Sequence, residues 1–155
     1  MAEQKEIQLV IFRLADEEFG LEISQVREII RIQDITPMPK APDFIEGVIN
    51  LRGQIIAVMD LARRFGLKSG GRSEKSRIVV VEIQGSTVGL VVDDVPEVLR
   101  IQSGNIDPTP EMLQSQVHAD FIKGVGKQEN RLIVLLDATK ILTKGEAGII
   151  GDTTV

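Results

Sequence analysis

The sequence contains an internal duplication, and this feature restricts the possible folds more than any other. Residues 19–33 align with residues 88–102 at a spacing of 69, and seven of the fifteen positions are identical. Residues 44–65 align with residues 121–142 at a spacing of 77, and six of the twenty-two positions are identical. The second spacing exceeds the first by eight residues, so the second copy carries an insertion within Ser103–Asp120. The chain is therefore expected to form two similar units.

Short apolar runs separated by Gly and Asp fill both copies and predict strands. In the first copy, apolar alternation at Gln8–Leu14 followed by Phe19–Ile23 predicts a hairpin. Two further strands are expected near Val48–Leu51 and Gln54–Met59. Ser24–Arg31 fits either one helical turn or an extended segment, because its apolar spacing is compatible with both.

Each copy, with its short strands and one-turn helix, is too small to bury a proper core alone. Short strands avoid exposed edges when their sheet curls into a barrel. We therefore predict an all-β fold in which two pseudo-symmetric barrels pack on each other around a shared hydrophobic core. Within one domain of residues 1–155, the expected parts are lobe one at about 6–67, a polar, glycine-rich linker at 68–76, lobe two at about 77–142 and a tail at 143–155.

Composition excludes several classes of function. The 155 residues include no cysteine, which excludes disulfides, thiolate metal sites and cysteine nucleophiles and suits a reducing cytosol. Eighteen Lys and Arg against 23 Asp and Glu give a net charge of -5, the wrong sign for a protein that binds nucleic acid. The apolar runs fall far short of the roughly 20 residues of a membrane helix, and the N-terminus lacks the apolar region of a secretory signal. We expect a soluble, cytoplasmic protein.

The sequence shows no arrangement of residues typical of catalysis. The single histidine, His118, has neither a second histidine nor a cysteine to share a metal ion or a proton, so no metal is expected. The nucleophile motif GxSxG and the glycine-rich phosphate-binding motifs are absent. Asp60 and Asp137 recur before the short helices and are expected to cap them. Binding is the function that remains.

A polar interruption of the strands at Asn50–Gln54 predicts the tip of a hairpin. Gly53 lies where a tight turn requires a positive φ, so Arg52 is expected beside the turn. Arg52 is either a solvated surface charge or a multi-donor group that a rigid hairpin presents to a partner. In the second copy, the residues that replace Asn50, Leu51 and Arg52 are Lys127, Gln128 and Glu129.

Three segments resemble CheW-type chemotaxis coupling proteins: Phe44–Leu61, Ile35–Gly53 and Val88–Ile101. The resemblance covers about Glu6–Leu142. It implies two five-stranded SH3-like barrels and a free-standing adaptor without catalytic activity or cofactor. Such an adaptor binds the cytoplasmic tip of transmembrane chemoreceptors and the regulatory domain of the histidine kinase CheA, and joins membrane receptor clusters through these partners without entering the membrane itself.

The resemblance also implies a receptor-binding groove between the barrels, with an apolar lining from both lobes and a polar rim. Pro96 departs from the pattern of the family, and Met38 and the barrel ends are candidates for kinase binding. Gly47, Gly53 and Gly124 are expected at turn or other structural positions. The implied groove residues are Val26, Glu28 and Ile29 on lobe one, Val95 and Val98 on lobe two, and Asn50 and Arg52 on the rim.

Two alternatives remain open at the level of the residues. Val26 and Val95 fit ordinary core burial as well as a groove. In a different functional class, a small-molecule-binding or hydrolytic twin barrel would use Asp93, Asp94 and Glu97. Such a protein requires a closed, acid-lined pocket in which polar groups converge.

Overall fold

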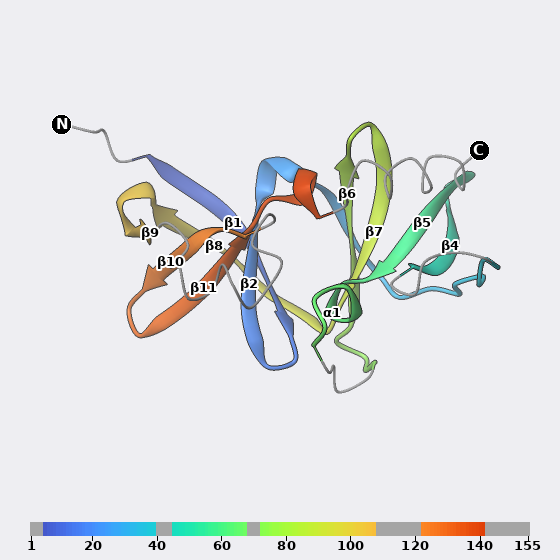
Figure 1. The fold of residues 1–155 in the computed structure, drawn as a ribbon, viewed down its shortest axis with the longest axis horizontal. Coiled ribbons are helices and arrows are strands. Elements are labelled where there is room, and N and C mark those ends of the chain that lie inside the picture. The colour runs from blue at the N-terminus through green and yellow to red at the C-terminus, as the bar shows by residue number, and fades with distance from the viewer. Residues whose placement is uncertain (1–4, 40–44, 68–71, 108–121, 142–155) are drawn as a thin grey trace.

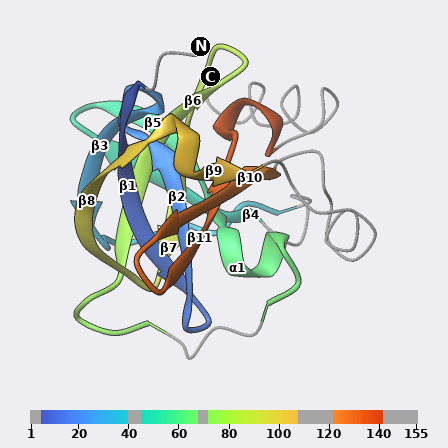
Figure 2. The same ribbon diagram turned by 90° about the vertical axis from the view of Figure 1, so that its left-hand side faces the viewer.

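The computed structural model describes residues 5–39, 45–67, 72–107 and 122–141, which form two β-sheets in two halves of the molecule (Figure 1). The predicted tail, His118 and most of the insertion lie outside the described residues. Sheet A occupies one half, and Figure 2 shows its longer strands side by side across the half that faces the viewer. In spatial order, its strands are Asp94–Gln102 (β8), Glu6–Leu14 (β1), Glu17–Glu22 (β2), Arg131–Leu136 (β11), Ile122–Gln128 (β10) and Ile106–Asp107 (β9).

Sheet B fills the other half of the molecule in Figure 1 and has five strands. The short helical segments are Ile23–Gln25 (η1), Leu61–Arg64 (α1), Ser103–Asn105 (η2) and Ala138–Lys140 (η4). Ser24–Arg31 fitted either a helical turn or an extended segment. In the structure, its first two residues belong to η1 and the rest form strand β3 (Val26–Arg31). In spatial order, the strands of sheet B are Val26–Arg31 (β3), Arg77–Ile83 (β6), Ser86–Val92 (β7), Gln54–Asp60 (β5) and Ile45–Leu51 (β4).

The two sheets do not follow the predicted division into lobe one, 6–67, and lobe two, 77–142. Sheet A takes its β1–β2 hairpin from the first copy and its other strands from the second, whereas sheet B takes β6 and β7 from the second copy. The two copies have exchanged their first hairpins. The predicted linker, 68–76, accordingly joins α1 to β6 in the same half, and the chain passes between sheets at η1 and at Asp93.

The strand registers repeat the duplication seen in the sequence. In sheet A, β2 and β11 run parallel with Phe19 opposite Val134, and in sheet B, β7 and β5 run parallel with Val88 opposite Ala57. These are equivalent pairs, because the spacings of 69 and 77 carry one pair onto the other. The predicted pseudo-symmetry is thus present in the strand pairing.

Each sheet closes on itself through the chain that continues from one edge strand. After β3, Thr36 bridges Val48 in β4, with both backbone N–H···O distances at 2.8 Å. After β8 and η2, β9 pairs with β10, with Asp107 opposite Val125. This closure pairs the backbone at Thr36 and at β9 but leaves one edge of β3 and of β8 free, so each sheet forms a small barrel as predicted, barrel A from sheet A and barrel B from sheet B.

Apolar side chains form one core inside each barrel and a third core shared between the barrels. The shared core takes Phe12 and Phe19 from sheet A and Met59 and Leu90 from sheet B. Strand β1 sends Leu9 into its barrel and Phe12 into the shared core, so it is buried on both faces. This two-sided burial corrects the alternation expected at Gln8–Leu14, because β1 has the unbroken apolar run Leu9–Phe12 and its equivalent β6 has Ile78–Val81.

Caps and close backbone contacts fix the ends of the repeated units. Asp60 Oδ1 accepts a hydrogen bond from the Arg63 N–H at 3.2 Å, and Asp137 Oδ1 accepts one from the Thr139 N–H at 3.0 Å, which confirms both predicted caps. A Cβ added at Gly47 would lie 2.1 Å from the Thr36 carbonyl oxygen, where barrel B closes.

Gly124 holds the equivalent position in the other barrel, where an added Cβ would lie 2.6 Å from the Asp107 carbonyl oxygen. Each glycine also adjoins a register shift in its hairpin. The close backbone contact explains why glycine occurs at this position in both copies. It also shows that the two glycines act at the closure of the barrels rather than in hairpin turns.

The substitution Gly47→Ala should lower the free energy of unfolding by about 3 kcal/mol, because the new methyl group meets a fixed backbone oxygen. Urea unfolding followed by circular dichroism would measure the loss. Gly85→Ala is the matched control, since Gly85 also has a positive φ, of 85°, but an added Cβ there meets nothing within 4 Å. Equal losses in the two variants would show that the contact with Thr36 is unimportant.

Candidate functional site

The hairpin between β4 and β5 ends in a tight turn that carries Arg52. Leu51 pairs with Gln54, and the two residues between them have φ values of 51° at Arg52 and 88° at Gly53. Two consecutive positive φ values define a type I′ turn, so the predicted hairpin tip is confirmed. Asn50 Oδ1 accepts a hydrogen bond from the Gly53 N–H at 2.8 Å, which gives Asn50 a role in holding the turn.

Arg52 occupies the left-handed region of the backbone, which costs about 1 kcal/mol for a residue with a side chain. The sequence thus places a long, charged side chain where glycine or asparagine would be more stable. The other three hairpin turns in the described residues also hold non-glycine residues at positive φ, namely Ala15, Asp16, Gln84 and Glu129. This backbone conformation follows from the turn type, and what distinguishes Arg52 is the contact that its guanidinium makes.

The guanidinium of Arg52 forms a two-pronged ion pair with Glu28 on β3. One guanidinium nitrogen donates to Glu28 Oε1 at 3.0 Å, and the other contacts Oε2. The hydrogen bonds from Arg52 hold the pKa of Glu28 below its usual value, and those to Glu28 raise the pKa of Arg52. The Arg52 side chain nevertheless remains 69% exposed, so it is fixed in direction and still accessible.

The ion pair borders a shallow, polar hollow of about 180 Å³ on barrel B. Arg27 spans part of this hollow, because its guanidinium donates to Thr87 Oγ1 on β7 at 3.1 Å. The hollow contains neither Val95 nor Val98. Its lining residues are Arg27, Glu28, Leu51, Arg52, Gln54, Val80 and Thr87.

The apolar candidates on β3 point away from the ion pair. Glu28 lies opposite Val80, a residue of the barrel B core, whereas Ile29 lies opposite Val79, a residue of the shared core. Residues opposite each other in a sheet share a face, so Glu28 and Ile29 occupy different faces of β3. Both faces can be reached from the free edge of β3, which pairs only with β6 in sheet B.

The four predicted apolar groove residues divide into two equivalent pairs. Val26 and Val95 are half-buried and pack against the shared core, as the core alternative anticipated. Ile29 and Val98 are 38% and 51% exposed on β3 and β8. The structure therefore brings Glu28, Asn50 and Arg52 together and leaves Val95 and Val98 on the other barrel.

Pro96 lies in β8, which is an edge strand of sheet A. The register of β8 against β1 shifts between Ile11 and Arg13, which removes Pro96 from the ladder of paired residues. An edge strand with a bulge tolerates a residue that lacks a backbone N–H. The departure from the family pattern is accommodated without a break in the strand.

A second carboxylate–guanidinium cluster, which the sequence did not predict, lies at the equivalent position of barrel A. Arg131 donates to Glu18 Oε1 at 3.2 Å and to Glu97 Oε1 at 3.3 Å. Glu97 is the equivalent of Glu28, but Arg131 comes two positions later in its hairpin than Arg52 does. The identity of the two glutamates in the alignment was the signal that could have revealed this cluster.

The three acids of the enzyme-like alternative have separate structural partners. Asp93 Oδ2 accepts the Ala15 N–H at 2.9 Å, Asp94 pairs with Arg13 at 3.5 Å, and Glu97 pairs with Arg131. Within the described ranges, no group of three potential metal-ligating side chains is found. The closed acid-lined pocket that this alternative requires is not formed by these residues.

Two closed barrels around a shared core, with an exposed ion-paired hairpin on one of them, define a twin SH3-like barrel protein. The chain belongs to the CheW-like family, since the CheW-like domain matches residues 8–146. None of the helices in the described part of the chain is long and apolar enough to span a membrane.

Two relatives named chemotaxis protein CheW are similar to this chain over nearly their whole length. The chain is 36% identical to chemotaxis protein CheW of Rhizobium meliloti, over 90% of this chain and 89% of that protein. It is 37% identical to chemotaxis protein CheW of Thermotoga maritima, over 89% of each. The crystal structure of the scaffolding protein TtCheW from Thermoanaerobacter tengcongensis superposes with a TM-score of 0.84 at 39% identity, covering 92% of this chain and 96% of that one.

The cluster at Arg131 gives a pH prediction, because the hydrogen bonds from Arg131 lower the pKa of Glu18 from 4.5. A carboxylate with a lowered folded-state pKa stabilises the protein above its unfolded-state pKa, and this stabilisation is lost as the pH falls through the folded-state pKa. Arg131→Gln should therefore lose about 1 kcal/mol at neutral pH and progressively less below pH about 4.

Urea unfolding at a series of pH values would measure this difference. The matched control is Arg100→Gln, because Arg100 is 67% exposed and lies 3.7 Å from Glu6. It should show almost no difference from the wild type at any pH. A loss in Arg131→Gln that stays constant down to pH about 3 would mean that Glu18 does not contribute through its charge.

Proposed function

We propose that this protein is a non-catalytic adaptor that couples transmembrane chemoreceptors to the histidine kinase CheA in a receptor–coupler–kinase complex. Membership of the CheW-like family supports this proposal, together with the scaffolding role named for the related solved structure. The observation that carries it is the Arg52–Glu28 pair, in which two contacts orient the guanidinium while the Arg52 side chain remains 69% exposed at the hairpin tip.

The receptor site that we propose lies along the free edge of β3. Exposed Ile29 supplies apolar surface on one face, and the Arg52 hairpin supplies charge on the other. An amphipathic helix from the tip of a receptor could contact the apolar face while its polar side chains meet the guanidinium. Val98 is the equivalent of Ile29 in barrel A and is also exposed, so it offers a second apolar contact.

Kinase binding is assigned to apolar side chains at other exposed positions. Leu132 on β11 is 65% exposed, and its equivalent on β5, Ile55, is 38% exposed. Both follow directly after a hairpin turn, so they lie near the ends of their barrels. Met38, at 36% exposure, remains a further candidate. Leu132 and Ile55 lie in different barrels, so they are separate candidates rather than one surface patch.

Charge reversal at Arg52 tests the receptor site. Arg52→Glu should weaken binding to a soluble receptor signalling fragment about tenfold, because one charge-assisted contact is lost and a repulsive charge takes its place. Isothermal titration calorimetry would measure the affinity, and the melting temperature should change little because the Arg52 side chain is 69% exposed.

The double variant Glu28→Arg with Arg52→Glu is the control for this experiment. It restores an ion pair on the hairpin but moves the guanidinium to β3. Receptor binding should therefore remain weak, and the melting temperature should again stay close to that of the wild type. Unchanged receptor affinity in Arg52→Glu would refute the proposed site.

Leu132→Ser tests the kinase surface. It should weaken binding to the regulatory domain of CheA by about tenfold, since a largely exposed apolar contact is removed without opening a core. Binding to the receptor fragment should be unchanged in the same variant. Ile55→Ser is the same kind of substitution at the equivalent position of barrel B. Equal affinities of Leu132→Ser and the wild type for the kinase domain would exclude Leu132 from the interface.

A further inference from the structure

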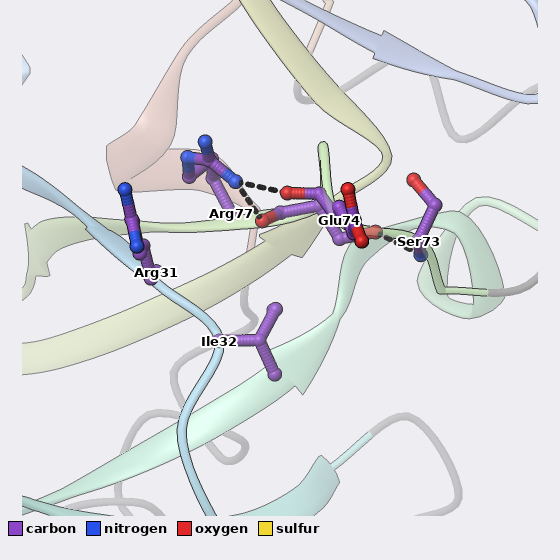
Figure 3. Close-up of a pocket in the computed structure, with 6 residues that line it drawn as sticks. Arg31, Ile32, Ser73, Glu74 and Arg77 are labelled. Carbon is purple, nitrogen blue, oxygen red and sulfur yellow. Dashed lines mark hydrogen bonds between the residues drawn. The ribbon is translucent and has the colours of Figure 1, made fainter.

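A second concave site, separate from the hollow at Arg52, lies between the end of β3 and the turn that precedes β6 (Figure 3). Its volume is about 410 Å³, and it shares no lining residue with the hollow. The family resemblance assigned no role to this place. The lining residues are Arg31, Ile32, Ser73, Glu74, Ser76 and Arg77.

Two guanidinium groups enter this site from neighbouring strands. Arg31 on β3 lies directly opposite Arg77 on β6, and Figure 3 shows both side chains on the same side of the pocket. One guanidinium nitrogen of Arg77 donates to the carbonyl oxygens of Glu74 and Ser76, each at 2.7 Å. These bonds to the main chain hold the Arg77 side chain in place but leave its charge uncompensated.

Neither guanidinium has an anionic partner in the described part of the chain. Arg31 is exposed, and its side chain forms no ion pair or hydrogen bond there. Glu74 is the one acidic residue of the lining, and it contacts Arg77 through its backbone oxygen rather than its carboxylate. Like charges directly opposite each other in a sheet are destabilising. The pair is therefore unfavourable unless an anion lies between the two groups.

The duplication provides an internal comparison for this site. In barrel A, Arg100 has Glu6 within 3.7 Å, so the charge on its edge strand is balanced. Arg31 is the equivalent of Arg100. In barrel B, Lys75 stands at the position of Glu6, and Arg77 stands at the position of Gln8. With Glu74 and its equivalent Lys5 included, these positions carry a charge of +2 in barrel B and +1 in barrel A, so the larger positive charge lies in barrel B, in a chain whose net charge is -5.

We propose that this pocket binds the carboxylate of a glutamate or aspartate side chain presented by a partner protein. Arginine donates two parallel hydrogen bonds to a carboxylate, and two arginines side by side can hold both oxygens. Half-buried Ile32 lines the same pocket and offers an apolar contact to the methylene groups of such a side chain. A free inorganic anion would leave this contact unused. The choice of a protein ligand rests on the proposed adaptor function.

Titration of the full chain, labelled with ¹⁵N, tests the proposal by NMR. The probes are a capped tetraglutamate peptide, its tetraglutamine counterpart and inorganic phosphate. The glutamate peptide should shift the Arg31 and Arg77 side-chain signals and the Ile32 amide, and the shifts should weaken as salt screens the charges. The glutamine peptide should cause no shift.

The variant Arg31→Gln should reduce the affinity for the glutamate peptide about tenfold, as expected for the loss of a charge-assisted hydrogen bond. It should not lower the melting temperature, because Arg31 has no partner to lose and the repulsion from Arg77 is relieved. Arg100→Gln, the equivalent change in barrel A, should leave the affinity unchanged.

Three results would overturn the proposal. They are an absence of shifts with the glutamate peptide, equal losses in Arg31→Gln and Arg100→Gln, and binding of phosphate without binding of the peptide. The experiment uses neither receptor nor kinase, so its outcome is independent of the Arg52 and Leu132 tests. A protein that binds the peptide but fails to bind CheA would refute the adaptor function and leave this pocket standing.

Discussion

The packing of the two exchanged hairpins against both barrels is the interaction on which the rest of the structure depends. Strands β1 and β6 send alternate side chains into their own barrel and into the shared core, so neither can be solvated on either face. A barrel of about five short strands has too little interior to be stable alone, and the shared core supplies the missing burial. The exchange also makes the halves inseparable, because each barrel needs a hairpin from the other copy.

This arrangement fixes the positions of the exposed groups to which the proposed function is assigned. The Arg52 hairpin and Glu28 belong to one barrel, and their ion pair connects β4–β5 to the edge strand β3. The equivalent corner of the other barrel is held by Arg131 and carries no hairpin arginine at the tip. Pseudo-symmetry thus gives two similar frameworks, and single substitutions between the copies make their surfaces different. The adaptor function that we propose, with two different partners, requires surfaces that differ in this way.

Local patterns predicted a large part of the fold and some of the site. Strand propensity, the turn chemistry of Arg52 and Gly53, and the recurrence of Asp60 and Asp137 as caps depend on neighbouring residues, and each was confirmed. The predicted lobe boundaries failed for a different reason. An apolar run that is buried on both faces fits either sheet equally well, so the sequence does not show which strands it joins.

The sequence by itself determined the duplication, the all-β class, the hairpin tip and the family, because these follow from residue identity and short spacings. Only the tertiary structure decided that the copies exchange hairpins, that Glu28 and Ile29 occupy opposite faces of β3, and that Arg31 meets Arg77. Each of these depends on strand register between segments far apart in the chain. Register is set by the fit of whole apolar faces in three dimensions, where a shift of one residue reverses every side chain.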